Sequence, residues 1–284
     1  MKTITLNNQI KIPEIGLGVF LLTPTQAYNS TLYALKNGCR LIDTANIYQN
    51  ERAVGKAIKD SGIKREEIFI STKIWTSEYT NPNCINETLQ RLGVDYIDLL
   101  FLHQPCTDKK TYINAYKMLE QAYKEGKIKS IGLSNCEGKY INQILDNCII
   151  KPQVVQVECH PYFTQKELIK NSLESNNIKL MSWYPLGHAD SKLLNEKILK
   201  NLANKYNKTT AQIIIRWHIQ KGFIVIPGSK NLEHIKENLD IYDFELSNKD
   251  MELISSIDIN KRYYIRTDES LNKFKDLKPE YEKE

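Results

Sequence analysis

Short apolar runs alternate with amphipathic segments along most of this chain. Three of the runs end at a polar residue, and these residues are Asp43, Lys73 and His103. Continuous apolar runs of this length are typical of buried parallel strands. The three polar residues follow one another at intervals of about thirty residues. We therefore expect an acid, an amine and an imidazole to converge at the same end of neighbouring strands.

The same pattern predicts five further strands, at residues 15–19, 128–133, 154–157, 180–184 and 223–226. Helical patterns separate the strands. In residues 111–125, for example, apolar side chains recur at steps of three and four residues before Gly126. Eight strands with helices between them predict an α/β fold of the (β/α)8 TIM-barrel type. A β-hairpin is predicted at residues 3–12, ahead of the barrel.

No linker, repeat or low-complexity block divides the chain, so residues 1–284 are predicted to form a single (β/α)8 barrel domain. Additional helices are predicted within residues 195–222 and 248–257. From about residue 260 to residue 284, Lys, Glu and Asp dominate and form a C-terminal tail. The pattern leaves open whether the tail wraps over the barrel or stays mobile.

Composition narrows the function classes. The 284 residues are 41% hydrophobic and 26% charged, as in an ordinary globular protein. The net charge of +5 comes from scattered lysines, which argues against nucleic acid or membrane as a partner. With no apolar stretch of about 18 residues and no signal-peptide pattern, we expect a cytoplasmic protein. Six widely spaced cysteines predict reduced thiols and no metal site.

Tyr48 adds a phenol to the three polar strand ends. Lys73 could simply close the barrel through a salt bridge with Asp43, or it could act on a neighbouring group. A free tyrosine has a pKa of about 10, and a nearby ammonium lowers it. We therefore predict that Lys73 lowers the pKa of Tyr48, that Asp43 keeps Lys73 charged, and that His103 binds the same reacting oxygen. Such a set suits carbonyl reduction, in which a proton must reach oxygen.

Eight segments of the chain resemble the aldo-keto reductase superfamily, in the order of that superfamily and from roughly residue 14 to residue 258. They are LIDTANIYQNERAVG, STKIW, DYIDLLFLHQP, GKIKSIGLSN, VVQVECHPY, SWYPLG, IIIRWHIQKG and VIPGSKNLEHIKENL. Within the superfamily the chain is similar to small bacterial and protist members of the diketogluconate-reductase and prostaglandin F synthase type.

The resemblance implies a (β/α)8 barrel and NAD(P)H-dependent reduction of aldehydes and ketones. Tyr48 would be the proton donor, Lys73 would tune it, Asp43 would brace Lys73, and His103 would orient the carbonyl. NADPH would bind without a Rossmann domain. In agreement, the Gly16-Leu-Gly18 segment lacks the third glycine of a dinucleotide-binding loop.

The resemblance also implies a set of cofactor contacts. Ser134, Asn135 and Gln156 would bind the nicotinamide carboxamide, and Tyr184 would stack on the nicotinamide ring. Turn capping by Ser-Asn and packing of Tyr184 are the structural alternatives. The remaining expected cofactor residues are Gly18, Leu186, Gly187, Ile226, Pro227, Gly228, Ser229, Lys230, His234, Glu237 and Asn238.

One departure from the family concerns the 2′-phosphate of NADPH. Many relatives read I-P-K-S and carry an Arg five residues beyond that Ser, whereas this chain has Gly228 before Ser229 and His234 at the Arg position. Arg binds phosphate bidentately and stays charged, while His binds it weakly near neutral pH. Lys230 could compensate. We expect a reduced preference for NADPH, with appreciable use of NADH.

The substrate cleft is expected to be lined by Phe20, Ile47, Trp75 and Gln104. Phe20 and Gln104 stand where tryptophan is common in the family, and Gln104 should make its wall smaller and more polar. The resemblance also places the C-terminal tail, from about residue 260 to residue 284, near this cleft. Because the tail is short and charged, we expect an open cleft and broad selectivity for small-molecule carbonyl substrates. The resemblance further implies a monomer.

Two other functions are consistent with parts of this pattern. The first is a regulatory barrel that binds a cofactor and a protein partner, although such a protein has no need of Tyr48 beside Lys73. The second is a hydrolase that uses Asp43 and Glu158 as paired carboxylates. Lys73 beside Asp43 argues against it, because a neighbouring ammonium keeps an acid ionised and unable to donate a proton.

Overall fold

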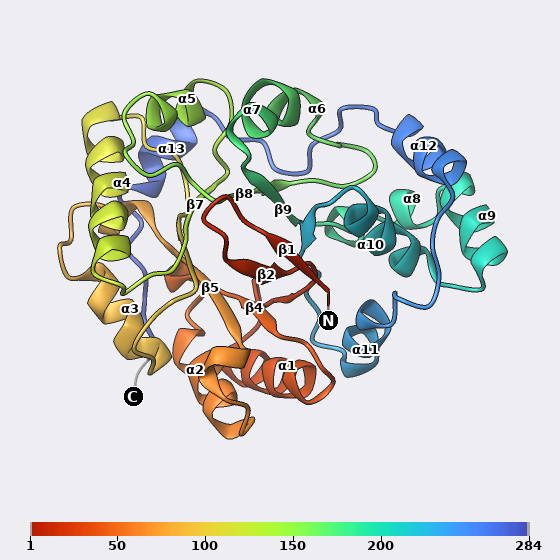
Figure 1. Cartoon of the computed structure of the whole chain (residues 1–284), viewed down its shortest axis with the longest axis horizontal. Coiled ribbons are helices and arrows are strands. Elements are labelled where there is room, and N and C mark those ends of the chain that lie inside the picture. Colours follow the sequence, from red (N-terminus) through yellow and green to blue (C-terminus); the bar gives the residue numbers. More distant parts are fainter. Residues whose placement is uncertain (1, 283–284) are drawn as a thin grey trace.

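A parallel sheet closed into a barrel organises the structure, a computed structural model that describes residues 2–282. Within these residues, eight parallel strands pair in chain order from β3 to β10 (Figure 1). The strands are β3 (Leu17–Gly18), β4 (Leu41–Asp43), β5 (Phe69–Ile74), β6 (Leu99–Leu102), β7 (Ile131–Ser134), β8 (Val154–Glu158), β9 (Lys179–Trp183) and β10 (Ile224–Val225). A parallel bridge between Ile15 and Val225 joins the first strand to the last. The predicted (β/α)8 barrel is confirmed.

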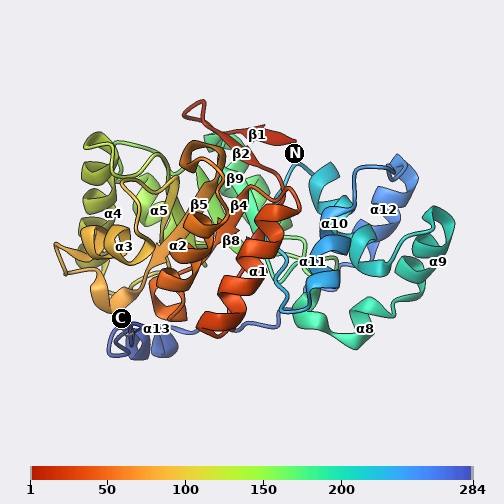
Figure 2. The same cartoon turned by 90° about the horizontal axis from the view of Figure 1, so that it is seen from below.

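A two-stranded hairpin lies at one end of the barrel, as predicted. Its strands, β1 (Thr3–Thr5) and β2 (Lys11–Pro13), pair antiparallel. Leu6 and Ile12 of the hairpin join a buried cluster with residues at the starts of the barrel strands, such as Leu41. The hairpin therefore plugs the amino-terminal end of the barrel and leaves the carboxyl ends of the strands for a site. Figure 2 shows the hairpin and α13 at opposite ends of the molecule.

Helices surround the sheet (Figure 1). They are α1 (Pro24–Lys36), α2 (Glu51–Asp60), α3 (Cys84–Leu92), α4 (Lys109–Lys124), α5 (Lys139–Leu145), α6 (Lys166–Leu168), α7 (Glu174–Asn176), α8 (Ser191–Leu194), α9 (Lys197–Tyr206), α10 (Thr210–Gln220), α11 (Leu232–Leu239), α12 (Asn248–Ser256) and α13 (Asp268–Phe274). The helical pattern in residues 195–222 is realised mainly as α9 and α10.

The amphipathic faces explain how the helices pack. In α4, Tyr112, Tyr116 and Leu119 are buried and join the cluster between the sheet and the helices. Each such side chain contributes about 1.5–3 kcal/mol through removal from water. Capping fixes the helix starts: the hydroxyls of Thr23 and Thr209 accept hydrogen bonds from backbone N–H groups in the first turns of α1 and α10.

The C-terminal tail runs over the carboxyl end of the barrel. The indole N–H of Trp75 donates to the carbonyl oxygen of Phe274 at 3.0 Å. Further along, the ring of Tyr281 lies 4.0 Å from the guanidinium carbon of Arg91, and the Glu282 carboxylate accepts the N–H of Arg52 at 2.6 Å. The described part of the tail is thus attached to several elements. The last two residues of the predicted tail lie outside the described range.

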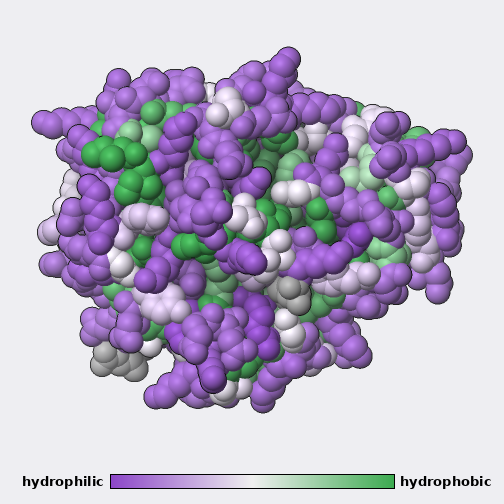
Figure 3. Space-filling view, in the orientation of Figure 1, coloured by the Kyte–Doolittle hydropathy of each residue, from purple (hydrophilic) through white to green (hydrophobic). Residues whose placement is uncertain are grey.

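Hydrophilic side chains cover most of the hairpin face, and hydrophobic residues occur there in small separate areas (Figure 3). Among residues 2–282, no helix combines the length and the apolar character that crossing a membrane requires.

Candidate active site

A buried ion pair joins the ends of two adjacent strands. Asp43 is the last residue of β4, and Lys73 lies in β5. The Lys73 ammonium donates to Asp43 Oδ2 at 2.6 Å and to the carbonyl oxygen of Thr44 at 2.8 Å. Asp43 is only 2% exposed and Lys73 1%. Burial lowers the pKa of Lys73, and the Asp43 charge opposes that shift. The predicted pairing is therefore present in the structure.

The second oxygen of Asp43 has two further donors. Ser71 Oγ donates to Oδ1 at 2.8 Å, and Gln156 Nε2 donates to it at 2.9 Å. Sequence reasoning did not identify Ser71, although the signal was available: residues two apart in a strand face the same side, so Ser71 and Lys73 share a face of β5. Gln156 was expected to contact a nicotinamide, but in this structure its amide nitrogen binds Asp43.

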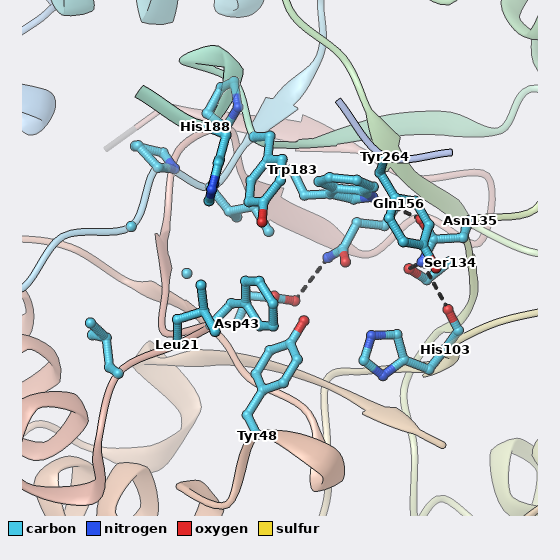
Figure 4. A pocket seen from close by; sticks show the side chains of 18 of the residues that line it. Leu21, Asp43, Tyr48, His103, Ser134, Asn135, Gln156, Trp183, His188 and Tyr264 are labelled. Atoms are coloured by element: carbon cyan, nitrogen blue, oxygen red, sulfur yellow. Dashed lines mark hydrogen bonds between the residues drawn. The ribbon is translucent and has the colours of Figure 1, made fainter. Parts of the chain in front are cut away.

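Tyr48 reaches the same spot from a loop. It ends a 3-10 turn, Asn46–Tyr48, directly after β4. The side-chain oxygen of Asn46 accepts the backbone N–H of Trp75 at 3.0 Å, which ties this turn to the end of β5. The Tyr48 ring centroid lies 5.0 Å from Lys73 Nζ and 5.5 Å from the His103 ring. In Figure 4 the Tyr48 hydroxyl points into the cavity, towards Asp43 and beside His103.

The pKa of Tyr48 departs from the sequence-based prediction. Burial raises it well above its ordinary value, and the negative charge of Asp43 raises it further. The net shift of the Tyr48 pKa is therefore upward, opposite to the predicted lowering. The reason is geometric, because the Lys73 ammonium donates to Asp43 and Thr44 and leaves the cost of desolvation dominant. Tyr48 is consequently a neutral phenol that carries a proton at neutral pH.

His103 follows β6 and completes the group. Its ring makes an edge contact with Trp75, with centroids 5.0 Å apart. Its carbonyl oxygen accepts the side-chain N–H of Asn135 at 3.1 Å. Burial, assisted by the Lys73 charge, lowers the pKa of His103 well below its ordinary value. The imidazole is therefore neutral at neutral pH and has one N–H to donate.

These side chains lie at one cavity of about 650 Å³. Its walls include many predicted residues, namely Gly18, Phe20, Asp43, Ile47, Tyr48, Trp75, His103, Gln104, Ser134, Asn135, Gln156, Tyr184, Leu186, Ile226, Pro227, Gly228 and Ser229. Lys73 does not line the cavity itself but binds Asp43, which does. Five other predicted residues do not line the cavity; they are Gly187, Lys230, His234, Glu237 and Asn238.

The half of the cavity expected to hold a dinucleotide has preformed polar groups. Asn135 donates its side-chain N–H to Ser134 Oγ at 3.2 Å and accepts the indole N–H of Trp183 at 3.1 Å. At the other end, a Cβ atom on Gly228 would lie 2.7 Å from the carbonyl oxygen of Gly18. Glycine at position 228 thus lets the chain after β10 approach the end of β3 closely.

The predicted phosphate and adenosine contacts lie along α11, outside the cavity. Asn231 caps this helix by accepting the N–H of Glu233 at 3.0 Å, and Ser229 Oγ accepts the N–H of Asn231 at 3.0 Å. Lys230 and His234 are exposed. A helix start beside exposed basic side chains suits an anion.

The other half of the cavity is aromatic. The predicted residues Phe20, Ile47, Trp75 and Gln104 all line it. Sequence reasoning missed several other lining residues, namely Leu21, Leu22, Trp183, Pro185, His188, Ala189, Tyr264 and Phe274. Tyr264 and Phe274 come from the tail, which was expected near the substrate cleft but as a charged segment. The aromatic residues among its charges were the available signal.

Glu158 does not form a carboxylate pair with Asp43 at the cavity. It ends β8, is buried, and does not line the cavity. Its two oxygens accept the backbone N–H groups of Tyr263 and Tyr264 at 2.6 and 3.1 Å. This arrangement argues against the hydrolase alternative, because both oxygens are committed to the tail.

Comparisons with known proteins agree with the fold and identify the family. The sequence model of the aldo/keto reductase family matches residues 14–259. Glyoxal reductase of Bacillus subtilis is 42% identical over 95% of this chain and 97% of its own length. Methylglyoxal reductase DkgA of Escherichia coli K12 is 37% identical over 88% and 91%. The crystal structure of the aldo-keto reductase MGS-M4, from a deep-sea metagenome library, has a TM-score of 0.89 at 39% identity and covers 92% of this chain and 97% of its own.

Proposed function

Because this chain belongs to the aldo/keto reductase family, we propose that it reduces aldehydes and ketones to alcohols with a nicotinamide cofactor, using NADPH in preference to NADH. The observation that carries the proposal is the convergence of a neutral phenol, a neutral imidazole and a buried Lys–Asp pair at one aromatic cavity. When bound, the reduced nicotinamide supplies the hydride that is added to the carbonyl carbon.

Tyr48 is the proposed proton donor. As the carbonyl oxygen gains negative charge it becomes strongly basic, comparable to an alkoxide, and its conjugate acid resembles water, with a pKa of about 15.7. A phenol is intrinsically a stronger acid than an alcohol, and burial in the same cavity raises the pKa of both groups, so the proton moves downhill to the substrate oxygen. The raised pKa also keeps Tyr48 protonated before each turnover.

His103 is proposed to orient the substrate. A neutral imidazole beside the Tyr48 ring can donate an N–H to the carbonyl oxygen without competing as a stronger acid. The two donors would then bind one oxygen from different directions, and this fixes the carbonyl carbon in the cavity.

Lys73 and Asp43 are proposed to stabilise the tyrosinate that remains after proton transfer. The ammonium lies 5.0 Å from the Tyr48 ring centroid and is fixed by Asp43 and Thr44. A fixed positive charge in a buried site favours negative charge on the phenol oxygen during transfer without any reorganisation. Lys73 would stabilise the negative charge that develops on the Tyr48 oxygen during proton transfer, while Tyr48 stays protonated before the reaction.

The cofactor would occupy the part of the cavity between Gln156 and Ser229. Ser134, Asn135 and Gln156 would bind the carboxamide, Tyr184 would stack on the ring, and Leu186 with Gly187 would cover the diphosphate. The other proposed contacts are Gly18, Ile226, Pro227, Gly228, Ser229, Lys230, His234, Glu237 and Asn238. Lys230 follows Ser229 directly and His234 lies five residues beyond it, and these two basic side chains would bind the 2′-phosphate of NADPH.

We propose small aldehydes as substrates, with dicarbonyls such as glyoxal and methylglyoxal, the compounds named for two relatives, among them. Phe20, Ile47 and Trp75 provide apolar contacts, and Gln104 adds a polar group. The six free thiols fit a reducing compartment, so we infer that the protein works in the cytoplasm.

The direct test is oxidation of NADPH by purified protein in the presence of methylglyoxal, glyoxal, an aromatic aldehyde and a steroid ketone, each repeated with NADH. We expect turnover of the small aldehydes with both cofactors and a higher kcat/KM with NADPH. Turnover of the steroid alone would contradict the substrate class. Cofactor binding without turnover of any carbonyl would favour the regulatory alternative.

A further inference from the structure

A second set of contacts, most of them partly buried, lies outside the four proposed catalytic residues and holds the tail segment 261–264. The Glu158 carboxylate accepts the N–H of Tyr263 at 2.6 Å and the N–H of Tyr264 at 3.1 Å. One of its oxygens also lies 3.0 Å from His160 Nε2. Hydrogen bonds from N–H groups to an ionised carboxylate are among the stronger ones in proteins. The tail backbone is therefore fixed at the carboxyl end of β8.

The side chain of Tyr263 makes a different attachment. Its hydroxyl donates to Asp190 Oδ2 at 2.5 Å, and the Lys261 ammonium binds the same oxygen at 2.8 Å. Asp190 also caps α8 through the N–H of Lys192 at 2.9 Å. These donors hold the pKa of Asp190 well below its usual range, so it is a carboxylate at neutral pH. Tyr263 is thus bound to β8 through its backbone and to the loop before α8 through its hydroxyl.

The Tyr263 ring also packs against that loop. Gly187 has a φ of +60°, and a Cβ atom there would lie 3.0 Å from Cε2 of Tyr263 and 2.7 Å from a side-chain carbon of Leu193. Any larger residue would push Tyr263 away. The absence of a side chain at position 187 therefore lets the tail and the loop of residues 186–190 touch.

The two segments that Tyr263 joins, the loop of residues 186–190 and the tail, both contribute to the cavity wall. Leu186, His188 and Ala189 of the loop line the half proposed for the cofactor. In the tail, Phe274 packs on Trp75 in the aromatic half, and Tyr264 contacts Gln104 and lies 5.7 Å from the Trp183 ring, between the two halves. In Figure 4, Trp183 lies between His188 and Tyr264, and Tyr264 lies beside Asn135 and Ser134. Tyr263 itself does not line the cavity. Tyr263 joins the loop of residues 186–190 to the tail segment from outside the cavity.

We propose that Tyr263 is a positioning residue that couples cofactor binding to carbonyl binding, because its bond to Asp190 ties loop 186–190 to the segment that carries Tyr264. The inference rests on the proposed function, since it assigns the two halves of the cavity to the two ligands. A cofactor that orders the loop in one conformation also orders Tyr264. In return, a carbonyl compound that packs on Tyr264 stabilises the loop. Such coupling is reciprocal.

The test compares Tyr263→Phe, which keeps the ring and loses the hydroxyl, with the wild-type protein. We expect the KM for an aromatic aldehyde to rise about fivefold to tenfold, while kcat at saturation changes by less than about twofold. Asp190→Asn should raise KM at least as much, because it also weakens the bond to Lys261. The double variant should be no worse than Asp190→Asn alone, because the Tyr263–Asp190 bond can be lost only once.

Tyr140→Phe is the matched control. The Tyr140 hydroxyl donates to Asp268 Oδ1 at 2.7 Å, so it also anchors the tail through a phenol–carboxylate bond, but from α5 and without contact to loop 186–190. We expect its KM to stay within about twofold of wild type. An equal rise in Tyr140→Phe and Tyr263→Phe would show that general anchoring of the tail is what matters and would overturn the coupling.

Amide hydrogen exchange gives a readout that does not need turnover. In the wild type, NADP⁺ should slow exchange at Tyr263 and Tyr264 as well as in residues 187–190, and in Tyr263→Phe the slowing should remain only in the loop. Persistence of the effect at Tyr264 in that variant would refute the coupling. If NADP⁺ binds the wild-type protein but no carbonyl compound is turned over, the proposed function fails, and this result differs from the loss of coupling in an active enzyme.

Discussion

At the residue scale, one carboxylate organises the site. Asp43 accepts hydrogen bonds from Lys73, Ser71 and Gln156, so all of its partners come from neighbouring or facing strands. Removing it would leave the Lys73 ammonium buried without its counterion, which costs several kcal/mol. Asp43 therefore serves both the stability of the barrel and the placement of the charge beneath Tyr48.

Replacing Tyr48 by Phe tests the proton donor. We expect kcat for aldehyde reduction to fall by about 10²–10⁴, because the phenyl ring fills the same space but has no proton to give. Quenching of protein fluorescence by NADPH should give a Kd within about twofold of wild type. Near-normal turnover would refute the role of Tyr48.

His234→Arg tests the phosphate site. We expect the Kd for NADPH to fall about threefold to tenfold with little change for NADH, because a permanently charged guanidinium binds the 2′-phosphate that only NADPH carries. Isothermal titration with both cofactors measures the difference, with His234→Gln as the control. Equal effects on both cofactors would show that the phosphate binds elsewhere. Adding Gly228→Lys should reduce the benefit, because its Cβ would meet the Gly18 carbonyl oxygen at 2.7 Å.

At the element scale, close packing of helices places the loop that carries Tyr48. This loop leads directly into α2, and α2 packs against α3 at Gly55. A Cβ atom at Gly55 would lie 2.1 Å from the carbonyl oxygen of Leu92, the last residue of α3. The small residue therefore sets the distance between two helices, and through α2 it fixes the turn that positions the phenol.

Gly55→Ala is expected to destabilise the protein by about 1–3 kcal/mol, although alanine is the better helix former. The collision with backbone atoms leaves no flexible side chain to move. Urea denaturation measures the change in the free energy of unfolding. Lys59→Ala, at an exposed position of the same helix, is the control and should stay within about 0.5 kcal/mol of wild type. A stabilised Gly55→Ala variant would show that α2 and α3 can separate at little cost.

At the scale of the whole molecule, burial of neutral histidines links stability to pH. His218 is buried in α10, with Nδ1 2.8 Å from the carbonyl oxygen of Ile214 and Nε2 3.2 Å from the Ser182 hydroxyl, so a neutral ring can donate at one nitrogen and accept at the other. Burial lowers its pKa to about 4. The pKa of His103 is lowered as well. Below pH 6.5 the unfolded chain therefore binds protons that the folded chain does not bind.

We expect the free energy of unfolding to be highest above about pH 6.5 and to fall as the pH decreases towards 4, with His218 contributing on the order of 3 kcal/mol. Urea denaturation at several pH values gives the slope. His218→Gln should flatten it, whereas His234→Gln, at an exposed position, should leave it unchanged. A slope that His218→Gln does not alter would assign the acid sensitivity to other groups.

The amino-acid sequence determined the barrel, because buried parallel strands need continuous apolar runs and amphipathic helices between them, and both are written locally in the chain. The spacing of Asp43, Lys73 and His103 likewise predicted their convergence, since the carboxyl ends of parallel strands share one end of a barrel. The position of Tyr48 beside these residues could also be predicted, because Tyr48 follows β4 after a short turn.

Tertiary structure alone decided the rest. The path of the tail depends on contacts between residues far apart in the chain, such as Tyr263 with Glu158 and Asp190, and no local pattern encodes them. The direction of the Tyr48 pKa shift depends on how completely the phenol is desolvated and on where the Lys73 ammonium donates, and both are set by packing. Sequence placed the chemical groups at one end of the barrel, and the distances and burial created by folding decided their charge states and their partners.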